Sequence, residues 1–199
     1  AMTGTGRHIH TLVEMPGGKI YLGCDDGVIV YNIRTGKWNR LTFHGDNKNS
    51  IDGRFVYSIL RDREGGIWIG TFYGGVKYIS PMGQRFSSYT NGRDGFKGNV
   101  VSHFCEDYSG HVWIGSDDGG LSCLNEKTGR FVTYVGSSLL SSYNVHALCV
   151  SGADLWIGTY TNGVICMNLV SGRMKRYAEK DGLDSKSCYA IYKDHLGRL

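Results

Sequence analysis

The sequence has only two prolines, no long apolar run and no block of like charges. Its apolar runs fall well short of the roughly 20 residues of a membrane-spanning helix, so we expect no direct membrane insertion. The net charge of +4 is mild and spread along the chain, which argues against a nucleic-acid partner. The seven histidines form no H-x-x-H or H-E-x-x-H pair, and neither G-x-S-x-G nor G-K-S/T occurs. The sequence therefore offers no local motif of a metalloprotease, a serine hydrolase or a phosphate-binding loop.

The six cysteines lack the spacing of a zinc site or a small disulfide framework, because no two are closer than 17 residues. Cys105 and Cys149 occupy equivalent places in neighbouring segments, and so do Cys123 and Cys166. Cysteines that follow a structural pattern are most simply small core side chains. We expect buried free thiols, with a bridge between neighbouring segments as the alternative, and neither a metal nor a cofactor.

What the sequence has in quantity is glycine, 30 residues, and an aromatic-glycine signature that recurs. The signature is clearest around Trp113, in Asp-Tyr-Ser-Gly-His-Val-Trp-Ile-Gly-Ser-Asp-Asp-Gly-Gly, and it returns around Trp68 and Trp156 and more loosely around Tyr21. The steps between these aromatic residues are 47, 45 and 43 residues. A period in the forties with such a signature is typical of a β-propeller.

Each unit contains four short β-prone runs separated by turn residues, which predicts one four-stranded antiparallel blade per unit. The predicted fold is all-β: a partial β-propeller over residues 1–199, with blades at about 8–43, 55–90, 100–135 and 144–178. Hairpin turns are expected at 34–37, 80–84, 126–130 and 170–173, and polar connectors at 44–53, 90–99, 135–143 and 178–186. Residues 187–199 align with the first strand of a fifth, incomplete blade, and the equivalent tryptophan would be residue 200. We therefore expect a piece of a larger propeller.

The first strand of each unit is apolar on both faces, as expected for a strand covered on both sides by neighbouring blades. The aromatic residues Tyr21, Trp68, Trp113 and Trp156 are interpreted as large wedges between blades, a structural role that we favour over sugar stacking. Four blades of a larger design should form an open arc, or a ring completed by another chain. Its exposed flanks would favour self-association, for example as a homodimer.

Two acidic patterns have a chemical and a structural interpretation. Asp62-x-x-Gly65 and Asp107-x-x-Gly110 are similar to the Asp-box of sialidases, although that box has one residue less between Asp and Gly. Asp25-Asp26-Gly27 and Asp117-Asp118-Gly119 could suggest calcium, but an oxygen cage needs more ligands at set spacing. In all four we favour turns in which Asp accepts hydrogen bonds from backbone amides.

Candidate binding residues are polar and aromatic side chains that differ between blades at otherwise strict positions. One such position is the start of the first strand, and the other follows the aromatic residue of the signature. The candidates are His10, Tyr57, His146, Tyr189, Phe72, Tyr73, Asp117, Asp118 and Tyr160. Tyr and His suit sugar or peptide contacts because each has a ring with a polar tip. Ordinary loop variation is the alternative for any one of them, and no catalytic residue is assigned.

The repeat, roughly V-x-x-I-x-x-D-x-x-G-x-x-W-I-G-T-x-x-G-G-V followed by G-R-F-x-x-Y, resembles the two-component regulator propeller repeat. It is carried by Val56–Tyr89 and Val101–Tyr134, by Val145–Tyr177 with a shortened first turn, and loosely by Ile9–Leu41. The connector Lys180–Leu183 is similar to that family too. The resemblance implies seven-bladed propellers, often in tandem, in the periplasmic sensor region of a hybrid histidine kinase, followed by a β-sandwich, a membrane span and the kinase.

Many sensors of this kind detect oligosaccharides and activate polysaccharide-utilisation genes. The resemblance therefore implies a non-catalytic sensing module that binds a small glycan, located in the periplasm, with the remaining blades and downstream domains of its parent chain as partners. Two alternatives stay open. A propeller enzyme acting on glycans, a hydrolase or a lyase, would need a carboxylate or Tyr-Arg constellation around the channel. A general protein-interaction scaffold would bind a protein and ignore sugars.

Overall fold

The computed structural model describes residues 8–41, 55–82, 86–92, 94–125, 128–134, 140 and 144–199. Within these residues, sixteen strands form four sheets, and each sheet consists of four strands that are consecutive in the sequence and pair in sequence order. The strand pairs are antiparallel. The predicted all-β propeller architecture of four-stranded blades is therefore confirmed.

The strands have the following bounds. Blade one contains β1 (Ile9–Met15), β2 (Lys19–Cys24), β3 (Gly27–Asn32) and β4 (Trp38–Leu41). Blade two contains β5 (Val56–Arg61), β6 (Ile67–Thr71), β7 (Gly75–Ile79) and β8 (Phe86–Tyr89). Blade three contains β9 (Val101–Glu106), β10 (Val112–Ser116), β11 (Gly120–Asn125) and β12 (Arg130–Thr133). Blade four contains β13 (Val145–Ser151), β14 (Asp154–Thr159), β15 (Val164–Asn168) and β16 (Met174–Tyr177), and a 3₁₀ turn, η1 (Glu179–Asp181), follows it.

The hairpins between the third and fourth strands share one turn chemistry. In blade one, Asn32 accepts hydrogen bonds on its side chain from the amides of Arg34 and Thr35, at 2.9 and 3.1 Å. Its carbonyl accepts the amide of Gly36, at 2.9 Å, and Gly36 has a φ of 68° that favours glycine. Equivalent turns start at Asn125 and Asn168, so turns occur where the sequence predicts them in blades one, three and four. The turn predicted at 80–84 lies partly outside the described residues.

The blades pack through the first strand of each following blade. Strands β1, β5, β9 and β13 contact one another in this order. The signature glycine makes this approach possible: a Cβ on Gly115 would lie 2.7 Å from Val145 Cγ1, and a Cβ on Gly23 would lie 2.8 Å from Val56 Cγ1. Real Cβ atoms do not approach so closely, so the W-I-G glycine is required by the neighbouring blade and not by a turn.

Within the part of the chain that the structure describes, the hydrophobic core forms three clusters, and each lies between two blades. Val28, Val56 and Ile69 represent the first, between blades one and two. Trp68 belongs to the second and Trp113 to the third, and these side chains are 4% and 5% exposed. Tyr21 and Trp156 are only half-buried. The signature aromatic residues thus lie between blades, and those of blades two and three, which have a blade on each side, are the most deeply buried.

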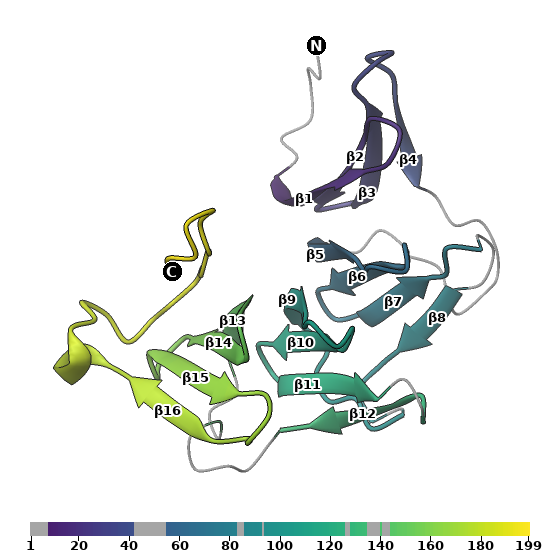
Figure 1. The fold of residues 1–199 in the computed structure, drawn as a ribbon. Helices are drawn as coiled ribbons and strands as arrows, with labels where there is room; N and C mark the ends of the chain where they lie inside the picture. The colour runs from purple at the N-terminus through teal and green to yellow at the C-terminus, as the bar shows by residue number, and fades with distance from the viewer. Residues whose placement is uncertain are drawn as a thin grey trace.

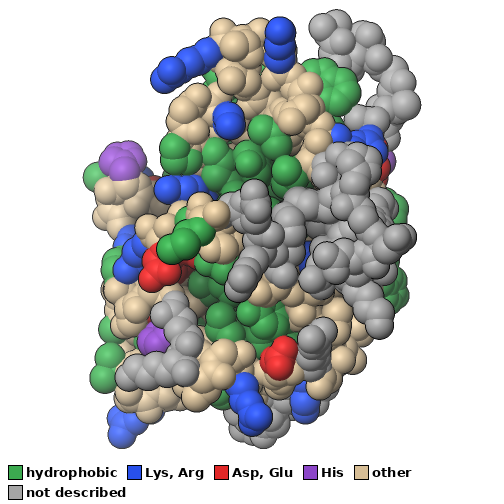
Figure 2. All heavy atoms as spheres, turned by 90° about the vertical axis from the view of Figure 1, so that its right-hand side faces the viewer, with side chains coloured by type: hydrophobic (Ala, Val, Ile, Leu, Met, Phe, Trp, Pro, Cys, Tyr) green, Lys and Arg blue, Asp and Glu red, His purple; other side chains and the backbone are tan. Residues whose placement is uncertain are grey.

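Figure 1 shows the four blades following one another around an arc, with β1, β5, β9 and β13 on its inner side. The described residues do not close this arc into a ring. On the outer side of the arc, Lys and Arg side chains are scattered and do not gather into one basic patch on the face shown (Figure 2). No helix in the described ranges is long and apolar enough to cross a membrane.

The fifth unit differs from the expectation, because residues 187–199 carry no strand. Cys188 donates its amide to the Thr159 carbonyl at 2.8 Å, but among the described residues no strand pairs with this segment. It still forms the repeat's turn: Asp194 accepts the amides of Leu196 and Arg198, at 2.9 and 2.8 Å. The turn is local and forms alone, whereas a strand needs a paired neighbour. The connector 44–53 and most of 135–143 lie outside the described residues.

Candidate functional site

A one-residue β-bulge interrupts the first strand of every blade at its start. In β1, Ile9 and Thr11 pair with β2 but the residue between them does not. In β5, Val56 and Ser58 pair with β6 in the same way, and equivalent shifts occur in β9 and β13. The residues left unpaired are His10, Tyr57, Ser102 and His146. A bulge bends the strand and re-aims a side chain, and bulges are enriched next to functional sites. The bulges therefore place the blade-specific residues on one rim of the arc, where the inner strands begin.

On blades one and two the rim carries a carboxylate, an imidazole and several aromatic rings. Asp25 Oδ1 lies 2.6 Å from His10 Nε2. The His10 ring stacks on Tyr57, with centroids 4.5 Å apart and planes at 23°. Tyr57 then contacts Phe72 at 5.6 Å, and Phe72 contacts Tyr73 at 4.3 Å. Four of the predicted residues are therefore brought together, and they join Asp25, which the sequence analysis did not select.

Blades three and four carry a similar group. Asp117 Oδ1 lies 3.4 Å from His146 Nδ1. The His146 ring lies 4.9 Å from Tyr189 and 5.8 Å from Tyr160, and the two tyrosine rings are 6.1 Å apart. Tyr189 comes from the segment after blade four, so its ring reaches the rim although no strand forms there. Four more of the predicted residues thus form a second cluster.

Asp118, the ninth predicted residue, accepts hydrogen bonds from groups of the chain itself. Its carboxylate accepts the amides of Asn99 and Val100, at 2.8 and 3.1 Å, and the hydroxyl of Ser116 at 2.9 Å. Burial raises the pKa of Asp118, but these hydrogen bonds outweigh burial and lower it. Asp118 therefore fixes the connector that enters β9, and its oxygens are already engaged.

The pKa values of the two rim carboxylates that contact imidazoles are shifted in opposite directions. The hydrogen bond with His10 is the main reason that the pKa of Asp25 is lowered. Burial raises the pKa of Asp117; His146 opposes this rise and Asp118 adds to it. Asp117 Oδ1 has no hydrogen-bond partner among the described residues. The pair on blade one is thus the tighter of the two.

Four tyrosines of the rim are exposed. Tyr57, Tyr73, Tyr160 and Tyr189 are 37%, 65%, 45% and 62% exposed. Of the His10 and His146 side chains, 22% and 19% are exposed, although His10 taken as a whole residue is exposed too. Tyr73 also has a φ of 60°, in the left-handed region that bulky residues rarely adopt. Strained residues of this kind cluster at functional sites.

The Asp-x-x-Gly motif is structural where the structure describes it. Asp107 accepts the amides of Ser109 and His111 on one oxygen, at 2.8 and 3.0 Å, and the indole N–H of Trp113 on the other, at 2.9 Å. Asp62 binds the Gly66 amide and the Trp68 indole in the same way, at 2.6 and 2.8 Å. The motif therefore ties each turn to the tryptophan of its own blade.

No metal-binding group of three or more His, Cys, Asp or Glu side chains occurs within the described ranges. In the Asp25-Asp26-Gly27 turn, Asp26 pairs with Arg40 and Asp25 binds His10. No disulfide joins the six cysteines, all of which lie in the described ranges; Cys24 is buried and the other five are half-buried. Cys105 lies against the Val150 amide and Cys149 against the Lys193 amide, each in the next unit along. Both thiols thus have a backbone amide of the next unit as a neighbour.

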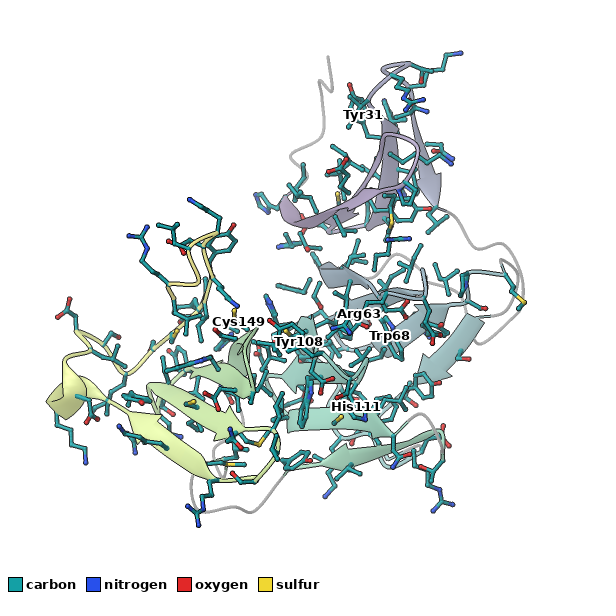
Figure 3. The ribbon with its side chains drawn as sticks, in the orientation of Figure 1. Tyr31, Arg63, Trp68, Tyr108, His111 and Cys149 are labelled. Atoms are coloured by element: carbon teal, nitrogen blue, oxygen red, sulfur yellow. The ribbon has the colours of Figure 1, made fainter. Side chains whose placement is uncertain are left out.

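Two cavities lie at the opposite end of the inner strands, on the side of the Asp-x-x-Gly turns. One, of about 560 Å³, lies between blades three and four beside Trp113, Tyr134 and Met167. The other, of about 520 Å³, lies between blades two and three. There Arg63 donates its amide to Glu106 at 3.0 Å and its guanidinium to the Tyr108 carbonyl at 2.8 Å (Figure 3). None of the nine candidate binding residues lines either cavity.

Asp25 and His8 are the rim residues that the sequence analysis missed. The His8 amide donates to Asp25 Oδ2 at 3.3 Å, and the His8 ring lies 3.4 Å from the same oxygen. A signal for Asp25 was present, because it stands four residues after Tyr21 just as Asp117 stands four residues after Trp113. The shared repeat position, read across blades, would have selected it.

Comparisons with known proteins agree with this architecture. The family model described as two component regulator propeller matches residues 50–73 and 95–118. No curated protein matches the chain. Among solved structures, the chain is similar to the extracellular domain of BT3049 from B. thetaiotaomicron, described as a hybrid two component system, with 25% identity and a TM-score of 0.78. That match covers 96% of this chain and 26% of the other, so this chain spans about a quarter of that domain.

Two further solved structures share the fold. The extracellular domain of BT4673 from B. thetaiotaomicron matches with 19% identity and a TM-score of 0.52, over 96% of this chain and 34% of the other. PorZ, of the type-IX secretion system of Porphyromonas gingivalis, matches with 15% identity and a TM-score of 0.64, over 95% of this chain and 30% of the other. From the repeat match, the four blades and the likeness to BT3049, we conclude that this chain carries two-component regulator propeller repeats, matched at residues 50–73 and 95–118.

Proposed function

We propose that this chain is part of the ligand-sensing propeller of a two-component sensor and that it binds an oligosaccharide at the rim without catalysing a reaction. The observation that carries this proposal is the set of exposed tyrosines from blades two and four and the following segment: Tyr57, Tyr73, Tyr160 and Tyr189. A tyrosine ring offers an apolar face to the C–H groups of a sugar and a hydroxyl to its oxygens.

The comparisons support the sensor part of the proposal. BT3049, to which the chain is similar, is described as a hybrid two component system, and the matched part is extracellular. We place this chain in the periplasm for that reason, with the histidine kinase and the intervening domains in the same parent protein. Ligand binding would favour one arrangement of the propeller and its partner domains, and that bias would reach the kinase as a population shift.

Isothermal titration calorimetry of this chain with maltohexaose, cellohexaose and mannohexaose tests glycan binding. We expect one of these oligosaccharides to bind and to remain uncleaved after overnight incubation. The Tyr160→Ala variant should weaken binding about three- to tenfold, the range of one aromatic contact. Tyr108→Ala is the matched control, because Tyr108 is also exposed but lies in the turn between β9 and β10, at the other end of the inner strand.

Equal losses in the two variants, or no binding of any glycan in a broader panel, would contradict a tyrosine-lined glycan site. Cleavage of the bound oligosaccharide would favour a glycan-degrading enzyme instead.

A further inference from the structure

The same chain of contacts, from a carboxylate to an imidazole to a tyrosine, occurs twice on the rim. The first runs from Asp25 to His10 to Tyr57, and the second runs from Asp117 to His146 to Tyr189. Asp25 and Asp117 occupy the same repeat position, four residues after the blade's signature aromatic residue. Both histidines are bulge residues of an inner strand.

The two groups reach this result by different routes. Asp25 contacts the histidine of its own blade, whereas Asp117 of blade three reaches across to the histidine of blade four. In both, the imidazole then contacts the tyrosine of the following unit. Two different sets of contacts thus produce the same order of carboxylate, imidazole and tyrosine, which indicates that this arrangement is functional.

The imidazoles are poorly placed to contact a ligand. Most of each side chain is buried, and each already has a carboxylate on one side and an aromatic ring on another. Tyr189 is 62% exposed, and Tyr57 is 37% exposed with its ring stacked on the largely covered His10 imidazole. A ring that is held by a neighbour loses less rotamer freedom when a ligand binds, so holding it in place improves affinity.

We propose that Asp25 and Asp117 are positioning residues of the glycan site, each orienting a histidine that holds Tyr57 or Tyr189 in its binding orientation. This inference rests on the proposed function and deepens it. The histidines selected from the sequence as ligand contacts become supports, and the tyrosines become the surface that meets the sugar.

The charged and titratable groups around each imidazole are few. Asp25 and His8 face His10, and Asp117, together with Tyr160 and Tyr189, faces His146. Next to Asp25 in the sequence stands Asp26, which pairs with Arg40. Asp26 therefore provides a control with the same change in charge, at a carboxylate that pairs with Arg40.

The experiment compares Asp25→Ala, Asp25→Asn and Asp26→Ala with the unmodified chain. Affinity is measured by calorimetry for the hexaose that the unmodified chain binds, and the contact between the His10 and Tyr57 rings is measured without ligand, as an aromatic NOE. We expect Asp25→Ala to lose the NOE and to bind about three- to tenfold more weakly. Asp25→Asn keeps a hydrogen-bond acceptor and should retain the NOE and most of the affinity, and Asp26→Ala should change neither.

Unchanged affinity in Asp25→Ala would overturn the positioning role. Lost affinity with an intact NOE would overturn it too, because Asp25 would then contact the sugar directly. If the unmodified chain binds no oligosaccharide, the proposed function fails, but the NOE still tests whether Asp25 holds His10 on Tyr57.

The second group gives an independent check. Asp117→Ala should weaken binding through Tyr189 in the same way. Because the two groups share no residue and lie on different blades, the fold-losses of Asp25→Ala and Asp117→Ala should multiply in the double variant. A double variant no weaker than either single variant would contradict two separate supports.

Discussion

Replacing Asp107 with alanine removes the acceptor that connects the first turn of blade three to its tryptophan. One oxygen of Asp107 holds the amides of Ser109 and His111, and the other holds the Trp113 indole N–H. Trp113 is 5% exposed, so its N–H cannot turn to water once the carboxylate is gone. A buried donor left without a partner costs about 1–3 kcal/mol.

The two amides contribute less, because the Ser109 and His111 residues are exposed and water can replace the acceptor. A net hydrogen bond of this kind contributes about 0.5–1.5 kcal/mol. Adding the buried donor to two such amide hydrogen bonds, we therefore expect Asp107→Ala to lower the free energy of unfolding by about 2–6 kcal/mol. This is a large part of the roughly 5–15 kcal/mol that stabilises a typical domain.

Urea denaturation at pH 7, followed by tryptophan fluorescence, measures this loss. Asp194→Ala is the control, because Asp194 holds the same turn through Leu196 and Arg198 but has exposed Arg198 on its second oxygen instead of a buried indole. We expect the control to lose much less stability than Asp107→Ala, because its hydrogen bonds are exposed to water. Equal losses in Asp107→Ala and Asp194→Ala would refute the argument that the indole contact dominates.

Three further predictions concern pH, blade packing and thiol chemistry. Burial raises the pKa of Asp107, but the hydrogen bonds it accepts outweigh burial and lower this pKa. The stability that Asp107 contributes is therefore complete above its pKa in the unfolded chain, about 4, and is lost as pH falls through its lower pKa in the folded chain. Asp107→Asn should make the free energy of unfolding less dependent on pH in acid, as measured by urea denaturation at several pH values. Gly115→Ala should cost about 1–3 kcal/mol in urea denaturation because its Cβ would meet Val145, and adding Val145→Ala should recover part of this loss. Burial, more than any other cause, raises the pKa of Cys105 to about 11, so at pH 8 iodoacetamide should label it about a hundredfold more slowly in the folded chain than in urea, as followed by mass spectrometry. A rate that is unchanged by folding would contradict the buried position of this thiol.

The sequence alone determined the strands, the turns and the repeat of this protein. Local signals define a hairpin such as Asn32–Gly36, in which one side chain and one glycine close the turn without help from the rest of the chain. The repeat spacing then indicated how many blades to expect and which repeat positions lie between them, because each blade buries the same positions. The same reasoning explains the fifth unit: its local turn at Asp194 formed, whereas its strand did not.

Tertiary structure alone decided which side chains meet at the rim and which of them face outward. From the sequence, His10 and Tyr57 are equivalent positions 47 residues apart, and nothing local shows that one ring stacks on the other. The stacking depends on how closely β5 packs against blade one and on a bulge that turns each side chain toward the rim. The partial covering of the imidazole side chains and the exposure of Tyr189 follow from that packing, because exposure depends on neighbours that are distant in sequence. Turns and strands arise from local conformational preference, but a binding surface is a property of the assembled blades.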